Sequence, residues 1–337
     1  MSRLLIMIAT MVGLASFCSC NHKELCLIHP HECSVYLDFD WTGAPEADPA
    51  GMCAFFYPAE GGEPRRYDLK GTSGGQISIK AGRYMVLCYN NDTEGVLFNG
   101  RNDFCCHEAF TRDGNIFESI YGNGYAPPPQ KGNGSEEERV VICPDMMWGS
   151  IAVEVEISES GVRYICSTTK GEHARFESKE FRITLYPTEL TCIYTYEIRN
   201  VRNLKHASQM CATLSGMSGG INLSTQRLFS ESITLPLESS FDKISTIKGS
   251  FITFGHHEEN PDPHRMLLYV WMDDGQKLLY GSDVDRFDVT DQIHNAPDKR
   301  RVHIVIDGLD LPQPIENGHG FNPSVDDWDV VEGDIMM

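Results

Sequence analysis

The residues best suited to chemistry in this chain lie together in residues 256–264, which read His-His-Glu-Glu-Asn-Pro-Asp-Pro-His. Imidazole and carboxylate groups are both ligands that zinc uses in proteins. The spacing differs from the HExxH pattern of metalloprotease helices, and Pro261 and Pro263 exclude such a helix here. We therefore interpret the segment as a solvated loop between two strands, and we predict neither a metal ion nor any other cofactor. An enzyme with a metal held by His256 and His264 is the alternative that this loop leaves open.

Paired carboxylates are a second candidate for catalysis, because Asp38 and Asp40 stand two residues apart. They belong to residues 34–41, in which apolar and polar residues alternate strictly. Side chains at i and i+2 of a strand share one face, so this pair is typical of the solvated face of a half-buried strand. The sequence also has no nucleophile elbow, no P-loop and no dinucleotide-binding glycine motif. We predict no catalytic residues and expect that the protein is not an enzyme.

Cysteine chemistry is predicted at the amino terminus. Arg3 precedes an apolar run over residues 4–15, which is too short to span a bilayer comfortably and has the layout of an export signal. Small Ser19 stands directly before Cys20. We predict a lipoprotein signal peptide over residues 1–19 and lipidation of the Cys20 thiol. Two or three acyl chains on Cys20 would hold the protein to a membrane, where a single chain binds only marginally.

The motif behind this prediction is Phe17-Cys18-Ser19-Cys20, which resembles a bacterial lipobox. It departs from the usual pattern because Phe17 stands at position minus three, where leucine is expected. Cys18 is the alternative lipid site, although the bulky Phe17 before it argues against that assignment. An ordinary cleaved signal that leaves a soluble secreted protein is the other alternative.

The remaining cysteines bear on redox chemistry. An even number in an exported chain permits disulfides, but their pairing cannot be deduced from the sequence. Cys26 and Cys33 flank a short segment and are the first candidate for a local disulfide. The alternative is that several are buried thiols in strands, as the apolar surroundings of Cys53, Cys88 and Cys192 indicate. Without Cys18 and Cys20, the chain has ten: Cys26, Cys33, Cys53, Cys88, Cys105, Cys106, Cys143, Cys166, Cys192 and Cys211.

The charge of the chain restricts its partners. The 337 residues contain 28 Lys and Arg against 48 Asp and Glu, a formal net charge of −20. Loss of the signal, whose only charged residue is Arg3, makes this −21. Nucleic acid and bare anionic lipid both need a positive protein surface, so we predict that neither binds this chain directly.

Sequence patterns typical of β-strands fill most of the chain. The predicted strands must position the histidines, carboxylates and cysteines named above. In the first half, residues 34–41 are followed by short apolar runs that end at Gly, Pro or Asn, and residues 122–138 have the composition of a long exposed loop. The first-half runs are 52–57, 66–69, 76–79, 83–89 and 139–143. Since no amphipathic helix separates the runs, the pattern argues against a parallel α/β sheet.

The second half repeats the pattern. Asp273-Asp274-Gly275 is a hairpin signal, residues 287–293 predict a brief helical turn, and residues 208–214 predict a short surface helix or a loop. The expected strands are 151–157, 180–186, 192–198, 250–254, 266–272, 277–280 and 302–306.

The fold class predicted from these patterns is all-β, with two tandem antiparallel β-sandwich domains. After the signal we expect a tether over residues 20–33, an N-terminal domain over residues 34–147 and a C-terminal domain over residues 148–312. Residues 313–337 form an acidic tail, in which Trp328 is too apolar to be left in water. We expect the tail to dock on the second domain, with Trp328 at least partly buried and with an added edge strand.

Taken together, the chain resembles the fimbrillin-like surface lipoproteins of Bacteroidales, which include fimbrial anchor and minor subunits. The resemblance implies transthyretin-like Greek-key sandwiches, an outer-membrane lipid anchor at the cell surface, and pilus anchoring or adhesion by protein–protein contacts. The implied partners are fimbrial subunits or ligands on host or bacterial surfaces. No clear protease-processing arginine precedes the first strand, which favours an anchor or tip role over a stalk role. The resembling residues are Cys20, Asp38-Phe39-Asp40-Trp41, Phe56-Tyr57-Pro58, Gly82-Arg83-Tyr84, Asn90-Asn91-Asp92, Phe287-Asp288-Val289-Thr290 and residues 320–328.

A glycan-binding surface lipoprotein for nutrient capture is the alternative function, because β-sandwiches often host that activity. Tryptophans that could stack on sugars are Trp41, Trp148, Trp271 and Trp328. Trp41 and Trp271 lie in apolar strand-like runs, however, and are expected in the core.

Overall fold

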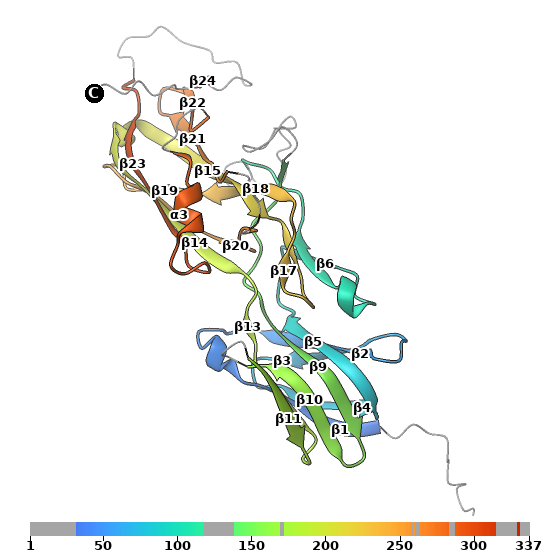
Figure 1. Ribbon diagram of the computed structural model, residues 1–337. Helices are drawn as coiled ribbons and strands as arrows, with labels where there is room; N and C mark the ends of the chain where they lie inside the picture. The colour runs from blue at the N-terminus through green and yellow to red at the C-terminus, as the bar shows by residue number, and fades with distance from the viewer. Residues whose placement is uncertain are drawn as a thin grey trace, which may run out of the picture.

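The computed structural model describes residues 32–117, 138–168, 172–257, 259, 263–282, 287–314 and 329–330. Regular structure in these residues is almost entirely β-strand, arranged in several sheets, so the all-β prediction is confirmed. Strands β1–β5 and β9–β11 lie at one end of an elongated molecule, and β14, β15 and β18–β24 lie at the other (Figure 1).

Two sheets pack together at the first end. Alternate residues of both, such as Leu37, Phe56 and Val155, meet in one buried cluster. The smaller sheet has the order β12-β1-β4, with bounds Arg182–Leu185, Glu32–Phe39 and Gly75–Lys80. The larger has the order β11-β10-β9-β5-β2-β3, with β13 (Thr188–Glu189) paired to β9, and bounds His173–Ser178, Gly161–Ser167, Trp148–Ser158, Gly82–Asn90, Gly51–Pro58 and Arg65–Lys70.

Two more sheets pack at the opposite end, where Tyr196, Leu214 and Ile304 belong to a second buried cluster. One has the order β19-β20-β14-β23, with bounds Ser240–Phe241, Ile247–Thr253, Cys192–Arg202 and His303–Asp310. The other has the order β24-β22-β21-β15-β18-β8, with bounds Asp329–Val330, Lys277–Tyr280, Met266–Met272, Ala207–Ser218, Ser232–Glu238 and Arg139–Val140.

A fifth sheet lies between the two ends (Figure 1). Its order is β17-β16-β7-β6, with bounds Arg227–Leu228, Gly220–Asn222, Glu108–Thr111 and Val96–Asn99. Ile221 of this sheet joins Phe55 and Tyr89 of the neighbouring large sheet in a third buried cluster. Strand β2 is therefore covered on both faces, which explains why its sequence is apolar without alternation.

Helical structure in the part of the chain described is short. The α-helix α3 spans Thr290–His294, where the sequence predicts a helical turn, and the Asp288 carboxylate accepts a hydrogen bond from the Thr290 amide at 3.0 Å. Single 3-10 turns cover Trp41–Gly43, Phe104–Cys106 and Leu204–His206. No helix in the described ranges is long and apolar enough to cross a membrane.

The strand pairing crosses the boundary that the sequence predicts between residues 147 and 148. Strand β9 pairs with β5, placing Ile151 opposite Leu87, and β12 pairs with β1, placing Ile183 opposite Leu37. Residues 148–185 therefore complete the sheets of the N-terminal strands. The alternation over residues 151–157 predicts a strand correctly, but a periodic pattern does not say which free sheet edge that strand will meet.

Strand β15 corrects the prediction of a surface helix or loop over residues 208–214. It is a long strand between β18 and β21 and is buried from Met210 to Ser218. Because both faces are covered, its side chains do not alternate between apolar and polar. Gly216 interrupts the run at a positive φ of 76°, where the pairing with β18 shifts register. Small and polar residues at this bulge hide the strand signal.

The prediction of antiparallel sheets is only partly right, because some sheets also contain parallel strand pairs. Strands β1 and β12 are parallel, as are β14 and β23, in which Tyr196 lies opposite Ile304. The hairpin expected at residues 273–275 is confirmed, since β21 and β22 pair antiparallel around it. Asp329 and Val330 of the tail pair with Leu278 and Leu279 as an edge strand, while Trp328 lies outside the described residues.

Candidate functional site

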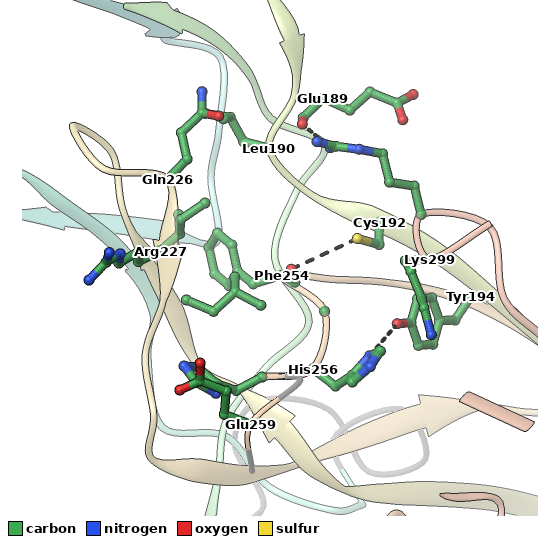
Figure 2. A pocket seen from close by; sticks show the side chains of 15 residues that line it. Glu189, Leu190, Cys192, Tyr194, Gln226, Arg227, Phe254, His256, Glu259 and Lys299 are labelled. Atoms are coloured by element: carbon green, nitrogen blue, oxygen red, sulfur yellow. Dashed lines mark hydrogen bonds between the residues drawn. The ribbon is translucent and has the colours of Figure 1, made fainter. Parts of the chain in front are cut away.

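A cavity of about 550 Å³ lies where the central sheet meets the start of β14 (Figure 2). Leu190, Ile221 and Phe254 give it an apolar wall that continues into the third buried cluster. The wall forms because β13 leads directly into β14, and the chain after β20 folds back against the same strand through Gly255, whose φ is 109°. The cavity is thus built by segments remote from one another in the sequence.

Polar groups surround the apolar wall. Figure 2 shows Arg227 on one side of the cavity and the pair Tyr194–His256 on the other. Two basic side chains are already engaged: Arg300 donates to the Glu189 carbonyl oxygen, and Lys299 donates to the His294 carbonyl oxygen. The arrangement offers hydrogen-bonding groups beside an apolar surface, which is the composition of a binding site for a small polar ligand.

The thiol in this wall is not an activated nucleophile. The Cys192 Sγ donates to the carbonyl oxygen of Phe254 at 3.8 Å, and burial raises the pKa of Cys192 to about 11. A thiolate is the reactive form of cysteine, so Cys192 stays a neutral thiol near pH 7. Burial also raises the pKa of Tyr194 above its ordinary value. These groups can bind a ligand, but their protonation states do not favour attack on one.

Three histidines meet beside the cavity. His256 follows β20, His264 precedes β21 and His294 ends α3, and their ring centres lie 4.9 to 5.3 Å apart. The Nε2 atoms of His264 and His294 are 3.0 Å apart, and the His256 Nδ1 lies 3.2 Å from the Tyr194 hydroxyl. Burial, followed by the charges of the other two rings, lowers the pKa of His256 to about 4.

The sequence identifies only two of these three histidines as candidate ligands. His256 and His264 both belong to the His-rich loop interpreted as solvated, yet both side chains are buried, at 6% and 1% exposure. Their burial corrects that interpretation for these two residues. His294 was missed because it lies 30 residues beyond His264, in a helical turn with no ligand-like spacing.

Another buried histidine, His107, lies among aromatic side chains of the third cluster. Its Nδ1 is 2.6 Å from the Tyr57 hydroxyl and its Nε2 is 3.1 Å from the Tyr89 hydroxyl. Both ring nitrogens have partners, and the rings of Phe55 and Phe98 lie 4.9 and 6.2 Å away. Burial lowers the pKa of His107 to about 4. This histidine links Tyr57 and Tyr89 within the third cluster.

The predicted lipidation and disulfide residues lie mostly beyond the described ranges. Cys20 and Cys26 fall outside them, so neither the lipid site nor a Cys26–Cys33 bridge is described. Cys33 itself is buried in β1, which begins at Glu32 and so takes up the end of the expected tether. The nine cysteines within the described ranges, Cys33 included, are not joined to one another by disulfides.

Asp38 and Asp40 each have a separate structural role. The Asp38 carboxylate is 3.1 Å from the Arg182 guanidinium on the neighbouring strand β12, and Asp40 accepts from the Thr42 amide at 2.9 Å. They belong to the polar surface, as the alternation predicts. Trp271 is buried, whereas Trp41 is half-buried and donates from Nε1 to the Thr72 carbonyl oxygen at 2.8 Å.

The sheets define an elongated all-β protein with a cavity between its two ends. The chain belongs to the family described as domain of unknown function DUF5119, which it matches over residues 19–238. A curated relative from Bacteroides ovatus, provisionally named fimbrium anchoring subunit Fim4B, is 30% identical over 93 residues. That match covers 27% of this chain and 27% of the relative, so it spans about a quarter of each.

One solved structure shows the same fold. A crystal structure from Bacteroides ovatus, described provisionally as an adhesin, superposes with a TM-score of 0.59 at 19% identity, covering 85% of this chain and 95% of that one. The fimbrial anchor protein Mfa2 from Porphyromonas gingivalis has a TM-score of 0.45 at 14% identity, covering 82% of this chain and 91% of that one. The family resemblance predicted from the sequence is confirmed by the family match and the curated relative.

Proposed function

We propose that this protein is a lipid-anchored cell-surface component of a fimbrium, serving as an anchoring, minor or tip subunit through protein–protein contacts. The observation that carries the proposal is the 30% identity to a protein named as a fimbrium anchoring subunit. The lipobox-like residues before Cys20 support it, because an anchoring subunit needs a firm attachment to the membrane. Adhesion follows from the same contacts, without chemistry on a substrate.

The elongated shape suits this role. Strand β1 lies at one end of the molecule, and β22 and β24 lie at the other (Figure 1). Eleven residues separate Cys20 from Glu32, where β1 starts. At roughly 3.4 Å for each residue, such a tether spans at most about 40 Å. We infer that the β1 end faces the outer membrane and that the opposite end is presented to a fimbrial subunit or another surface ligand.

We further propose that each end is a β-sandwich domain of the transthyretin-like, Greek-key type. The paired sheets with shared buried clusters support this division. The allocation differs from the predicted boundary, since residues 148–185 go with the membrane-facing domain. A signal peptide over residues 1–19 and a Cys26–Cys33 disulfide remain parts of the proposal.

Metabolic labelling with a clickable fatty acid in the native host tests the anchor. Wild-type protein is expected to carry the label, Cys20→Ala to lose it, and Cys18→Ala to keep it if export still proceeds. Cys18→Ala is the matched control, because it removes the neighbouring thiol of the same signal segment. An unlabelled wild type, or a labelled Cys20→Ala variant, contradicts the anchor assignment.

Glycan binding is the second candidate, and the cavity is the observation that favours it. The amide of Gln226 and the guanidinium of Arg227 can bond to sugar hydroxyls beside the apolar wall. A glycan array separates the candidates. Reproducible binding to one glycan class, abolished by Arg227→Ala, supports nutrient capture; no binding supports the fimbrial role.

A further inference from the structure

We propose that His256, His264 and His294 form a binding site for a divalent transition-metal ion such as Zn²⁺, with solvent as the fourth ligand. Neutral imidazole is a ligand for zinc, and three histidines with one open position make up a common site of this class. The inference is independent of the proposed fimbrial role.

The spacing of the rings is the first support. Zinc–nitrogen bonds of about 2.0–2.1 Å in a tetrahedral arrangement place three imidazole centres about 5 Å from one another. The three centre-to-centre distances here are 5.3, 4.9 and 5.0 Å. Two Nε2 atoms, those of His264 and His294, already lie 3.0 Å apart. Three side chains from separate segments thus share the ring separation that one ion imposes.

The remote ring nitrogens are the second support. The His264 Nδ1 lies 3.3 Å from the Ser215 carbonyl oxygen, which can only accept, so Nδ1 carries the proton and Nε2 keeps its lone pair. The His256 Nδ1 bonds to the Tyr194 hydroxyl. Metal-binding histidines almost always donate their other N–H to such a partner, which fixes the tautomer and the ring.

An orphaned buried atom is the third support. His256 is 6% exposed, and its Nε2 has no hydrogen-bond partner. A buried polar atom without a partner is costly, and a ligand absent from the structure is one explanation. A metal ion bound through this lone pair would satisfy it.

One adjustment is needed to close the site. As the rings stand, no three His, Cys, Asp or Glu side chains in the described ranges are ready to hold an ion. The two paired Nε2 atoms already converge, so the missing step is a turn of the His256 ring. The χ2 torsion of histidine is broad, and the Nε2 of His256 has no partner to lose, but the turn must be small enough for Nδ1 to keep its hydrogen bond to the Tyr194 hydroxyl. The His294 Nε2 must also release its proton to solvent or to its own Nδ1.

Charges around the trio both oppose and favour a cation. Lys299 lies close enough to lower the pKa of His256, as does His257, and both disfavour an added positive charge. The Asp288 carboxylate carries the opposite sign, and its pKa is held below the ordinary value by hydrogen bonds from Thr290 and by the charges of Arg265 and His264. Tyr194 and Cys192 are neutral near pH 7. His256 also lines the cavity, so solvent can reach a fourth coordination position.

Purified protein without its signal, in a Cys105→Ser, Cys106→Ser background, tests the site. This background removes two exposed thiols that would bind zinc on their own. After incubation with ZnCl₂ and dialysis, one zinc per chain is expected by elemental analysis, and Co²⁺ should give a tetrahedral visible spectrum. Zinc, but not magnesium, should raise the melting temperature, because binding to the folded state alone stabilises it.

Variants identify the ligands. His256→Ala, His264→Ala and His294→Ala should each weaken zinc binding by more than the roughly 10- to 100-fold cost of losing an outer-shell partner. Tyr194→Phe should weaken it within that range, and it serves as a milder variant if an alanine variant fails to fold. His257→Ala, in the same loop, is the matched control and should bind as the parent does. Absence of zinc from the parent overturns the proposal. So does a His256→Ala variant that binds zinc as tightly as the Tyr194→Phe variant does.

Discussion

At the scale of single residues, the aromatic pocket of His107 shows how burial decides protonation. The Tyr57 hydroxyl donates to the Arg101 carbonyl oxygen at 3.1 Å, so its oxygen is left to accept from the His107 Nδ1–H. The Tyr89 hydroxyl then donates to Nε2. The network therefore fits a neutral imidazole. A second proton would have to enter a site that burial and the charges of Arg101 and Arg66 both make unfavourable.

We predict that His107 makes the protein acid-sensitive. The pKa of His107 is lowered to about 4 in the folded state, against about 6.5 for an unfolded histidine. Between these values the unfolded state binds a proton that the folded state does not. The contribution to stability is therefore full above pH 6.5 and falls as the pH drops toward 4, by up to about 1.4 kcal/mol for each pH unit.

Urea unfolding at pH 7 and pH 5 measures this effect. His107→Gln should lower the free energy of unfolding at pH 7 and should reduce its loss between the two pH values. His173→Gln, which removes an exposed imidazole on β11, is the control and should keep the wild-type loss. If His107→Gln and wild type lose stability in parallel, the prediction is wrong.

What the sequence could predict at this scale depends on whether partners are local. The alternation that contains Asp38 and Asp40 identifies them as surface carboxylates, because their environment is set by the strand itself. The histidine trio could not be predicted, since His256 and His294 are brought together by α3 packing near the end of β20. The Tyr194 partner of His256 is 62 residues away. Burial of the loop histidines depends on the same packing.

At the scale of elements, the sequence predicts strands well where residues alternate or form an apolar run, and poorly where small and polar residues are buried on both faces. Strands β1 and β9 alternate and were found, whereas β15 is buried along most of its length and was not. The sequence predicts which residues form strands better than it predicts which strands pair with each other. The edge of β5 accepts β9 although residues 91–147 intervene, and nothing in the local sequence encodes that choice.

We predict that a fragment of residues 32–147 does not fold, although it contains the whole predicted N-terminal domain. Without β9 and β12, the buried faces of β5 and β1 lose the partners that cover Val86 and Leu37. A fragment of residues 32–186 is the control, because it restores β9–β12. Circular dichroism melts and amide exchange should show a cooperative transition with protected β5 amides only in the longer fragment. Two equally cooperative fragments would restore the boundary at residue 147.

At the scale of the whole molecule, the proposed role needs one end held at the membrane and the other presented to a partner. Strand β1 and the edge strands β22 and β24 lie at opposite ends (Figure 1). The net charge of −20 keeps such a surface from sticking to other acidic surfaces. The end-to-end arrangement depends on how the sheets join through the central one, which composition and periodicity do not determine.

Immunogold electron microscopy of the native host tests the central claim most directly, because it locates this chain relative to the fimbriae. An antibody against residues 32–314 should mark fimbriae at one end, and cells that carry only the Cys20→Ala variant should shed labelled filaments into the medium. Cells without the protein control for background. Label spread over the cell surface away from fimbriae, with filaments retained equally by Cys20→Ala cells, would contradict the proposed fimbrial role.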